Sequence, residues 1–539
     1  VSDFAAKVAA KGPDTVALLF YAGHGLQIDG ENYLIPIELD PKREADIPLQ
    51  AVRLNDVLNT LTSVPSKTRI IMLDACRNNP FPEIGKTVGH GLAQVDVKLG
   101  AAGAQPSPAP QVYTVVAGDT LSAIARRFGC NLQSLIDTNQ LADPNALRVG
   151  QQLRIPTLEV VSAPSTRLLP NSEFVYGPAY VGFDTEAFVQ KQGGYLAEYS
   201  EWLGGELLSG AEVVDLVAHH YSVGPRLLLA IMELRSNWVT GSAGQVSSLP
   251  LGYNGGGWDL LSRQLAWAAD ELNRGYYDWR GRGIAPLSWP DGTVSHYPLD
   301  LNAATAGLYY FFSLDSDRRG WEVLVGDGPG SFLEAYRQLF GDPARYAVEP
   351  LIPADTAIPE LVLPWARGED WFYTGGPHGA WSEGSAWAAV DFVPDEGFLG
   401  CQAATSWARA AAGGLVVYSG TGEVSLDLDG DGYEQTGWVL FYLHLATDGR
   451  VTEGTYLKQG DPVGHPSCEG GFAESTHLHF ARKYNGEWIA ADGPLPLVLS
   501  GWQFFSDGKE YDGTAVRGGE ERVAAEARDH SLNGLQTDR

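Results

Sequence analysis

The chain has 539 residues and a net charge of -29, with 37 Lys and Arg against 66 Asp and Glu. A surface this acidic repels phosphate backbones, which argues against nucleic acid as a partner. No apolar run approaches the roughly 18 residues that a membrane span needs, so we expect no membrane span. The chain begins at Val1, so any signal peptide would lie upstream of it.

Composition predicts a multidomain protein of four segments. The stretch 100–111 is rich in Ala and Pro and has no charge, which is typical of a linker, and 157–169 also lacks periodicity. Prolines between 349 and 364 interrupt any helix there. We therefore expect an α/β segment at 1–99, a small βααβ module at 112–157, a mostly α domain at 168–346 and an antiparallel β domain at 361–505. The polar tail 506–539 should be poorly ordered or form a short surface helix.

The first segment contains two apolar runs, 15–21 and 67–73, that predict buried parallel strands. His24 follows the first run and Cys76 the second, 52 positions later, within Asp74-Ala75-Cys76-Arg77. This pattern resembles the caspase/metacaspase clan. The resemblance implies Cys76 as a thiolate nucleophile and His24 as the base that activates it. The chain lacks the segments that would build the substrate pocket, so we interpret 1–99 as a truncated caspase-like fragment.

The second segment has a strand at Tyr113-Thr114-Val115, two helical stretches and a closing strand at 149–156. Its Gly118-Asp119-Thr120-Leu121 and its closing VGQQLRIP resemble a LysM module. The family binds glycans that contain N-acetylglucosamine, such as peptidoglycan. The resemblance implies a binding groove at Gly118, Asp119, Thr120 and the loop that begins at Asn139.

The third segment is helical by periodicity, most clearly over 213–238. Its run 227–236 resembles the helix that carries the catalytic acid of lysozyme-like lytic transglycosylases. Arg235 stands where that acid belongs, and Glu233 is about 200° away on a helix. A guanidinium cannot protonate a glycosidic oxygen, so we expect a lysozyme-like domain without catalysis. We interpret the adjacent His219 and His220 as a surface or core pair rather than a metal site, because neighbours do not share a helix face.

The fourth segment carries strand patterns at 414–418, 424–428, 438–444 and 476–482, separated by Gly-rich turns. His477 and His479 are two apart on a strand, so both rings point to one face. His444, His378 and Asp391 add two imidazoles and a carboxylate. Three N or O ligands with an open position for water are what a catalytic Zn²⁺ requires.

This set resembles the lysostaphin-type (LytM-like) zinc endopeptidases of cell walls. The resemblance implies His378, Asp391 and His479 as Zn²⁺ ligands, with His477 and His444 orienting the nucleophilic water and stabilising the oxyanion. The family places its first His and its Asp four positions apart, whereas here they are 13 apart. We interpret 380–389 as an insertion between ligands that still converge, with Asp395 as the alternative carboxylate.

Two further features belong to this segment. Asp427, Asp429 and Asp431 resemble half of a Ca²⁺ loop, but position twelve is Trp438 rather than Glu, which favours an acidic turn. Cys401 and Cys468 flank the predicted sheet, and a disulfide between them would fit an extracellular setting.

These patterns favour a cell-wall hydrolase: a zinc endopeptidase that cuts stem or cross-bridge peptides of peptidoglycan and is anchored to glycan by its LysM module. We expect it outside the cell or in the cell envelope. Two alternatives remain. One is a caspase-like cysteine peptidase with glycan-binding accessories, and the other is a wall-binding protein without catalysis.

Overall fold

The computed structural model describes residues 167–536, apart from 256–258, 283, 290–292, 299–300 and 398. Before Arg167 it describes the backbone of eight strands and a few single residues between the sixth and the seventh of them. None of the helices in this described part has the length and apolar character to cross a membrane.

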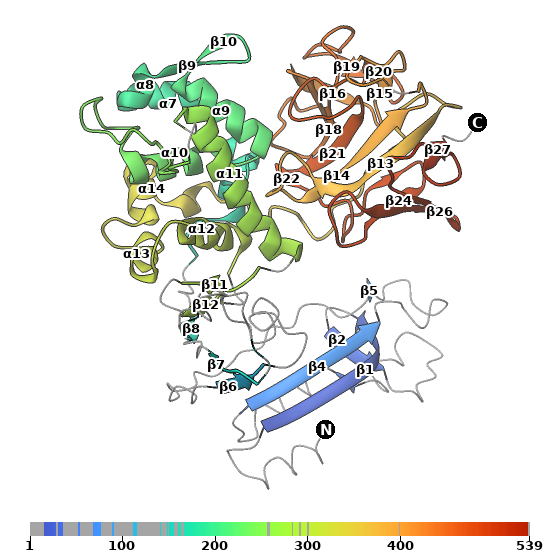
Figure 1. Ribbon diagram of the computed structural model, residues 1–539. Coiled ribbons are helices and arrows are strands. Elements are labelled where there is room, and N and C mark those ends of the chain that lie inside the picture. The colour runs from blue at the N-terminus through green and yellow to red at the C-terminus, as the bar shows by residue number, and fades with distance from the viewer. Residues whose placement is uncertain are drawn as a thin grey trace. The chain divides into compact units, whose positions relative to one another are not determined.

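The N-terminal unit contains a five-stranded sheet (Figure 1). Its strands are β1 (Val16–Ile28), β2 (Glu31–Ile35), β3 (Val52–Arg53), β4 (Thr68–Cys76) and β5 (Gly89–His90). The strand order is β3-β2-β1-β4, and β5 pairs with β1. Strands β1 and β4 run parallel, which confirms the two strands expected from the apolar runs.

The LysM-like segment contributes a two-stranded antiparallel pair, β6 (Gln111–Thr114) and β7 (Gln152–Ile155). Tyr113 lies opposite Leu153, whose side chain is buried. Strand β8 (Val160–Ser162) follows and pairs in parallel with β12 (Val294–His296), which in turn pairs with β11 (Leu287–Ser288). The stretch 157–169, expected to be a linker, therefore contains a strand.

All helices in the described part of the chain lie in residues 167–346, the helical domain. They are α6 (Asn171–Phe174), η2 (Pro178–Tyr180), α7 (Thr185–Gln192), α8 (Tyr195–Glu198), α9 (Gly210–Tyr221), α10 (Pro225–Ser236), α11 (Leu261–Tyr277), η3 (Asp278–Arg282), α12 (Ala303–Ser313), α13 (Arg318–Leu324), α14 (Phe332–Phe340) and η4 (Pro343–Tyr346). Between α8 and α9 lies a hairpin of β9 (Ser200–Leu203) and β10 (Glu206–Ser209).

Local sequence explains where α9 and α10 begin and end. Ser209 caps α9, and the side chain of Glu212 bonds back to the Ser209 amide, which completes a capping box. Pro225 opens α10, where its missing N–H costs nothing, and Asn237 in a left-handed conformation ends it. These signals place α9 so that its last turn, with His219 and His220, reaches the β domain.

Residues 361–536, the β domain, are built on a nine-stranded sheet that contains the four strands expected from the sequence (Figure 1). The path through the sheet is β19-β16-β17-β18-β21-β14-β13-β27, with β22 paired to β21. The strands are β13 (Asp370–Gly379), β14 (Trp387–Pro394), β16 (Gly414–Gly420), β17 (Glu423–Asp427), β18 (Trp438–Leu443), β19 (Tyr456–Leu457), β21 (Leu478–Tyr484), β22 (Glu487–Trp488) and β27 (Gly534–Gln536). Every pair within it is antiparallel, as expected.

Two smaller sheets complete the β domain. One pairs β15 (Ala408–Arg409) with β20 (Pro462–Gly464), and the other orders β23 (Val498–Leu499), β24 (Trp502–Ser506), β25 (Gly513–Arg517) and β26 (Glu520–Val523). The expectation of a poorly ordered or helical tail after residue 506 is therefore wrong. Its strands bury Ala515 and Leu535, and β27 adds to the edge of the main sheet beside β13.

The β domain also contributes to the core of the helical domain. The apolar cluster of the helical domain includes Ala380, Ala386, Ala388, Ala389, Phe441, Leu443, Ala481 and Trp488. Polar contacts support this packing: Asp270 of α11 accepts a hydrogen bond from the amide of Gly384 at 2.8 Å, and Arg280 pairs with Glu487 at 2.7 Å. The two domains thus share one core.

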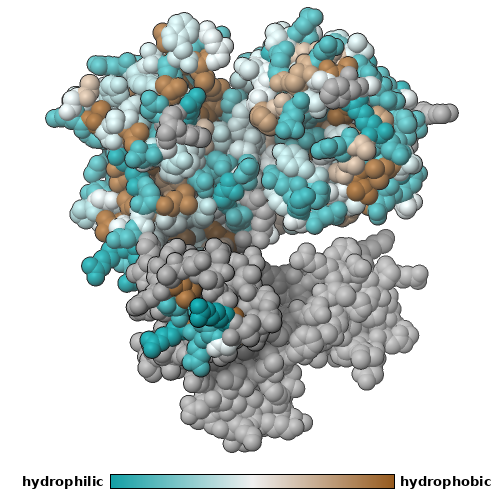
Figure 2. Space-filling model, viewed as in Figure 1, coloured by the Kyte–Doolittle hydropathy of each residue, from teal (hydrophilic) through white to brown (hydrophobic). Residues whose placement is uncertain are grey.

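The expected disulfide between Cys401 and Cys468 is present and spans 67 positions. The strand that follows Cys468 is tied to the same loop, because Thr476 donates hydrogen bonds to the carbonyls of Gly400 and Gln402 at 2.6 Å. On the face drawn in Figure 2, hydrophilic residues dominate the surface of residues 167–536, with apolar residues scattered among them.

Candidate active site

The three expected metal ligands lie on adjacent strands of the main sheet. His378 is the penultimate residue of β13, Asp391 is in β14 and His479 is in β21. These strands are neighbours in the order β21-β14-β13. Asp391 lies directly opposite His479 on one side and opposite Gly375 on the other. The β13–β14 hairpin therefore brings His378 and Asp391 together across their 13-residue separation.

The donor atoms of these three residues form a nearly equilateral triangle. His378 Nε2 lies 3.1 Å from His479 Nδ1, and Asp391 Oδ1 lies 3.4 Å from His378 Nε2 and 3.3 Å from His479 Nδ1. Bonds of about 2.0–2.1 Å to a tetrahedral Zn²⁺ place neighbouring donors about 3.3–3.4 Å apart. The alternative carboxylate, Asp395, lies instead beside His530, at 3.5 Å.

Hydrogen bonds outside the triangle orient the ligands toward its centre. His378 Nδ1 donates to the carbonyl of Gly376 at 2.8 Å, and His479 Nε2 donates to the carbonyl of Ala380 at 2.7 Å. The opposite nitrogen of each ring then carries a lone pair rather than a proton. Asp391 Oδ1 is buried and accepts no hydrogen bond. A buried, unpartnered carboxylate oxygen facing two lone pairs is unfavourable unless a cation lies between them, so the residues fit Zn²⁺.

The electrostatics give these groups the protonation states that a metal needs. Burial lowers the pKa of His378 to about 4, so the ring is neutral near pH 7. Burial raises the pKa of Asp391, but the neighbouring His378, His477 and His479 lower it more, and the net result is a pKa well below the usual range. Ionised carboxylate and neutral imidazole are the metal-binding forms.

The expected catalytic pair, His444 and His477, lies beside the triangle. Their ring centres are 4.4 Å apart, and His477 Nε2 lies 3.8 Å from Asp391 Oδ1. Each Nδ1 is bonded to a carbonyl, that of Glu469 at 3.1 Å for His444 and that of Ser475 at 2.8 Å for His477. Burial lowers the pKa of His444 to about 3, which keeps its ring neutral.

The backbone around this pair is under strain, and one ring reaches the surface. His444 follows the end of β18 with a φ of 64°, a conformation that non-glycine residues rarely adopt. The side chain of His477 is 16% exposed, more than that of Asp391 or either histidine of the triangle. The site therefore opens to solvent on the side of His477.

Sequence reasoning missed Tyr511 and Glu510, which lie in the turn between β24 and β25. The Tyr511 ring stacks on His378 with centres 4.2 Å apart, and the backbone of Tyr511 has a φ of 67°. Glu510 accepts a hydrogen bond from the amide of Gly379 at 3.1 Å. An exposed aromatic residue in a polar stretch was the available signal, but it fell in the segment expected to be a tail.

The other predicted site residues lie outside this cluster. The register of β1 and β4 places His24 opposite Cys76, although β1 continues beyond His24 to Ile28. Gly118, Asp119 and Thr120 lie outside the described residues. Asn139 is described, and its side chain bonds to both backbone groups of Arg154, at 2.8 and 2.7 Å.

In the helical domain, the two residues compared with a transglycosylase acid both have structural partners. Arg235 forms an ion pair with Asp315 at 2.7 Å. Glu233 accepts hydrogen bonds from the amides of Val239 and Thr240, both at 3.1 Å, at the end of α10. Glu233 thus satisfies backbone donors in the turn that follows the helix.

The acidic turn of the β domain likewise satisfies its own backbone. Asp427 accepts from the amides of Asp429 and Gly432, and Asp431 accepts from the amide of Tyr433. The twelfth position, Trp438, is buried in β18. These contacts agree with an acidic turn.

Comparison with family models identifies three parts of the chain. Residues 167–354 match the model described as LasA, N-terminal domain, residues 113–156 match the LysM domain and residues 1–134 match the caspase domain. The LysM and caspase-like resemblances are thereby confirmed. The helical domain matches the LasA model, and the lysozyme-like interpretation of it is not supported.

Curated relatives extend this likeness. Protease LasA of Pseudomonas aeruginosa is 26% identical over 377 residues in strain UCBPP-PA14, which is 65% of this chain and 82% of that protein, and 27% identical over 380 residues in strain PAO1. N-acetylmuramoyl-L-alanine amidase XlyA of Bacillus subtilis is 47% identical over 60 residues, 11% of this chain and 18% of the amidase.

Solved structures similar to the chain include two peptidases. The M23 metalloprotease pseudoalterin, described as from the deep sea, is 23% identical, with a TM-score of 0.27, and covers 31% of this chain and 96% of its own. The catalytic domain of lysostaphin from Staphylococcus simulans is also 23% identical, with a TM-score of 0.17, and covers 23% of this chain and 89% of its own. Over 65% of its length the chain is thus similar to protease LasA, and it also carries a LysM domain and a segment similar to the caspase domain.

Proposed function

We propose that the chain is a zinc-dependent endopeptidase that hydrolyses stem or cross-bridge peptide bonds of peptidoglycan. One observation supports the proposal most directly: the donor atoms of His378, Asp391 and His479 have the spacing of tetrahedral zinc ligands. One of these donors, Asp391 Oδ1, is buried and accepts no hydrogen bond. The similarity to protease LasA supports the same chemistry.

In this proposal His378, Asp391 and His479 hold the Zn²⁺. When bound, zinc polarises the scissile carbonyl and lowers the pKa of a bound water. His444 and His477 keep their Nδ1 protons on backbone carbonyls, so each has an Nε2 lone pair to offer. These nitrogens orient the attacking water, accept the proton it gives up and return that proton to the leaving amine.

The positioning of this pair depends on the disulfide region. His444 donates to the carbonyl of Glu469, the residue after Cys468, and the amide of Ser467 donates back to the carbonyl of His444 at 2.6 Å. The cross-link to Cys401 therefore restrains the segment that fixes the orientation of His444.

The remaining parts of the chain have roles in the same proposal. We assign the LysM module to 112–157, with Gly118, Asp119, Thr120 and Asn139 at its glycan groove, the helical domain to 168–346 and the peptidase domain to 361–536, which includes the strands after residue 505. Binding of an N-acetylglucosamine-containing glycan by the module concentrates the enzyme on its substrate. The disulfide supports a location outside the cell or in the cell envelope.

A second candidate function concerns the N-terminal unit. The register that places His24 opposite Cys76 on parallel strands, together with the match to the caspase domain, favours a cysteine peptidase centre there. It predicts activity that is lost on thiol alkylation and kept in the presence of a zinc chelator.

The test is digestion of purified peptidoglycan by the zinc-loaded full chain, with fragments analysed by mass. We expect new free amino termini from cut stem or bridge peptides, abolished by chelator and by His479→Ala but not by His465→Ala, which removes a histidine outside the site. Binding without fragments would refute the endopeptidase and leave a wall-binding protein. Fragments that persist with chelator and vanish with Cys76→Ala would move the activity to the N-terminal unit.

A further inference from the structure

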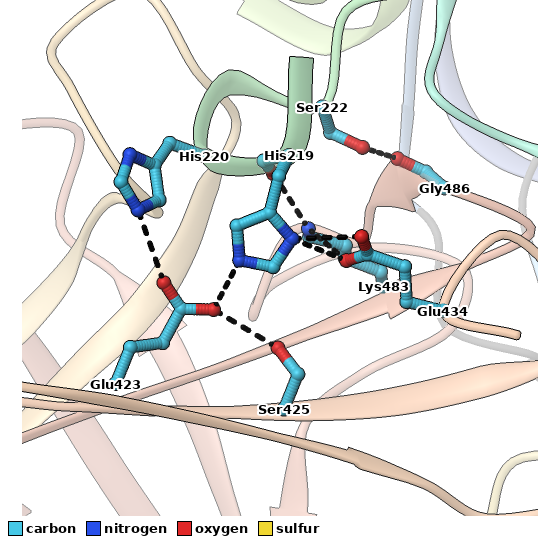
Figure 3. A network of polar contacts seen from close by, with 8 residues as sticks. All are labelled: His219, His220, Ser222, Glu423, Ser425, Glu434, Lys483 and Gly486. Atoms are coloured by element: carbon cyan, nitrogen blue, oxygen red, sulfur yellow. Dashed lines mark hydrogen bonds and ion pairs between the residues drawn. The ribbon is translucent and has the colours of Figure 1, made fainter. Parts of the chain in front are cut away.

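A second cluster of charged residues is buried where α9 meets the main sheet, apart from the candidate active site (Figure 3). It consists of His219 and His220 at the end of α9, Glu423 at the start of β17, Glu434 in the loop before β18 and Lys483 in β21. Their side chains are 7%, 17%, 0%, 14% and 1% exposed, in that order. The cluster thus joins the helical domain to the β domain.

Both histidines face the same carboxylate. His219 Nε2 lies 2.7 Å from Glu423 Oε1, and His220 Nε2 lies 3.5 Å from Glu423 Oε2. The interpretation of these neighbours as an ordinary structural pair is therefore incomplete. As adjacent residues of a helix, His219 and His220 point about 100° apart. The carboxylate of Glu423 lies between their rings, so each of its oxygens faces one of the two histidines (Figure 3).

The remaining contacts hold this arrangement in place. Both oxygens of Glu434 lie 2.7 Å from His219 Nδ1, and Lys483 Nζ lies 3.7 Å from Glu434. The His220 ring stacks on Trp381, with centres 4.0 Å apart and planes at 14°. In metal sites, a histidine ligand usually donates the N–H of one ring nitrogen to a carboxylate, which orients its other nitrogen toward the metal. Glu434 is placed to do this for His219.

One oxygen of the cluster has no hydrogen-bond donor, although His220 Nε2 lies 3.5 Å from it. Glu423 is fully buried, and its Oε2 accepts no hydrogen bond, while Oε1 accepts from Ser425 at 3.1 Å. Within the cluster, two carboxylates face one lysine, so the second negative charge must be balanced either by a proton on His219 or by a bound cation. Burial makes such a charge costly unless it is paired.

We propose that His219, His220 and Glu423 bind a second Zn²⁺, which joins the helical domain to the β domain. Two imidazole nitrogens and one carboxylate are a donor set that suits zinc, and their donor atoms all lie within 4.8 Å of one another. Two ligand atoms of a tetrahedral zinc lie about 3.3–3.4 Å apart. The distance of 3.5 Å between His220 Nε2 and Glu423 Oε2 is close to this value. The distance of 2.7 Å between His219 Nε2 and Glu423 Oε1 must increase by about 0.6 Å when zinc binds. The rival is a metal-free ion cluster with a proton on His219.

The location gives this ion a structural role. Trp381, which packs on His220, follows Ala380, whose carbonyl orients His479 of the candidate active site. The segment 380–381 therefore contacts both centres. Zinc at the second centre would hold that segment in place without contacting substrate.

The test is the zinc content of the full chain, measured by mass spectrometry after dialysis in metal-controlled buffer. We expect two zinc ions per chain in the wild type, one in His220→Ala and in Glu423→Gln, and two in the control His465→Ala. His479→Ala should also retain one, and the double variant His220→Ala, His479→Ala none. Equal zinc content in the wild type and in His220→Ala would overturn the proposal.

A titration that needs no variant accompanies this count. Metal-free wild type should bind two equivalents of Co²⁺ with two distinct visible spectra, and saturation at one equivalent would overturn the second centre. Loss of one zinc in His220→Ala but none in His479→Ala would refute the candidate active site instead and leave the second centre standing. The two proposals therefore fail separately.

Discussion

Gly375 leaves the space that the Asp391 carboxylate occupies, so Gly375→Ala tests the geometry of the candidate active site. The two residues lie opposite each other on β13 and β14. A Cβ on Gly375 would lie 3.0 Å from Cβ and Cγ of Asp391 and closer still to Oδ2, whereas ordinary contacts begin at 3.4 Å. The carboxylate must therefore move by at least about half an ångström, which is as much as a preorganised site tolerates.

We expect this displacement to weaken zinc binding at the catalytic centre by about 10- to 100-fold, which corresponds to about 1.4–2.7 kcal/mol. The affinity is measured by competition with a chromogenic chelator, and peptidoglycan cleavage should fall in parallel at limiting zinc. Gly413→Ala is the matched control, because the nearest atom to its new Cβ is 3.4 Å away. A Gly375→Ala protein with wild-type secondary structure and a zinc affinity within threefold of the wild type would refute the reasoning.

Three further predictions concern catalysis, the cross-link and a buried carboxyl. His477→Ala should keep the catalytic zinc but lower the rate of peptide cleavage by about 100- to 1,000-fold, because it removes a proton acceptor and not a ligand; loss of that zinc would contradict this role. Replacing Cys401 and Cys468 by Ser should lower the free energy of unfolding of the β domain by up to about 4 kcal/mol, since the cross-link closes a loop of 67 positions. Urea unfolding should show no such change for Cys130→Ser, which removes a cysteine that is not part of this cross-link. Burial raises the pKa of Asp215 to about 6, so the stability of the helical domain should fall as pH rises from about 4 to 6 and stay level above that. Asp215→Asn should then stabilise it near pH 7 by about 1–3 kcal/mol, and an unchanged melting temperature between pH 4 and 7 would count against this assignment.

The sequence predicted the centre of the main sheet because its strands there are continuously apolar or carry a local motif. The paired histidines of β21 identify a metal-binding face through the two-residue period of a strand. Strands β13 and β14 were harder to predict, since register shifts in β13 between Tyr373 and Gly379 interrupt the alternation that marks a strand. The hydrophobic pattern therefore did not reveal the hairpin that unites His378 with Asp391.

Contacts between distant segments were the part that sequence could not supply. Helical periodicity over 213–238 predicted α9 and α10 correctly, but it carries no information on what the last turn of α9 meets. His219 and Glu423 are 204 positions apart, and neither belongs to a motif. Tyr511 was missed for the same reason, because only the pairing of β24 with β25 brings its turn to His378.

The shared core has a consequence for proteolysis. The segment 347–360 connects the helical domain to the β domain and is largely without helix or strand. A protease that cut it would leave two polypeptides still joined by Trp488 and the segment 380–389, which are packed into the core of the helical domain. The nicked protein should copurify as a two-chain complex, and its pieces should separate only in denaturant, because parting them exposes apolar surface that neither piece can cover alone.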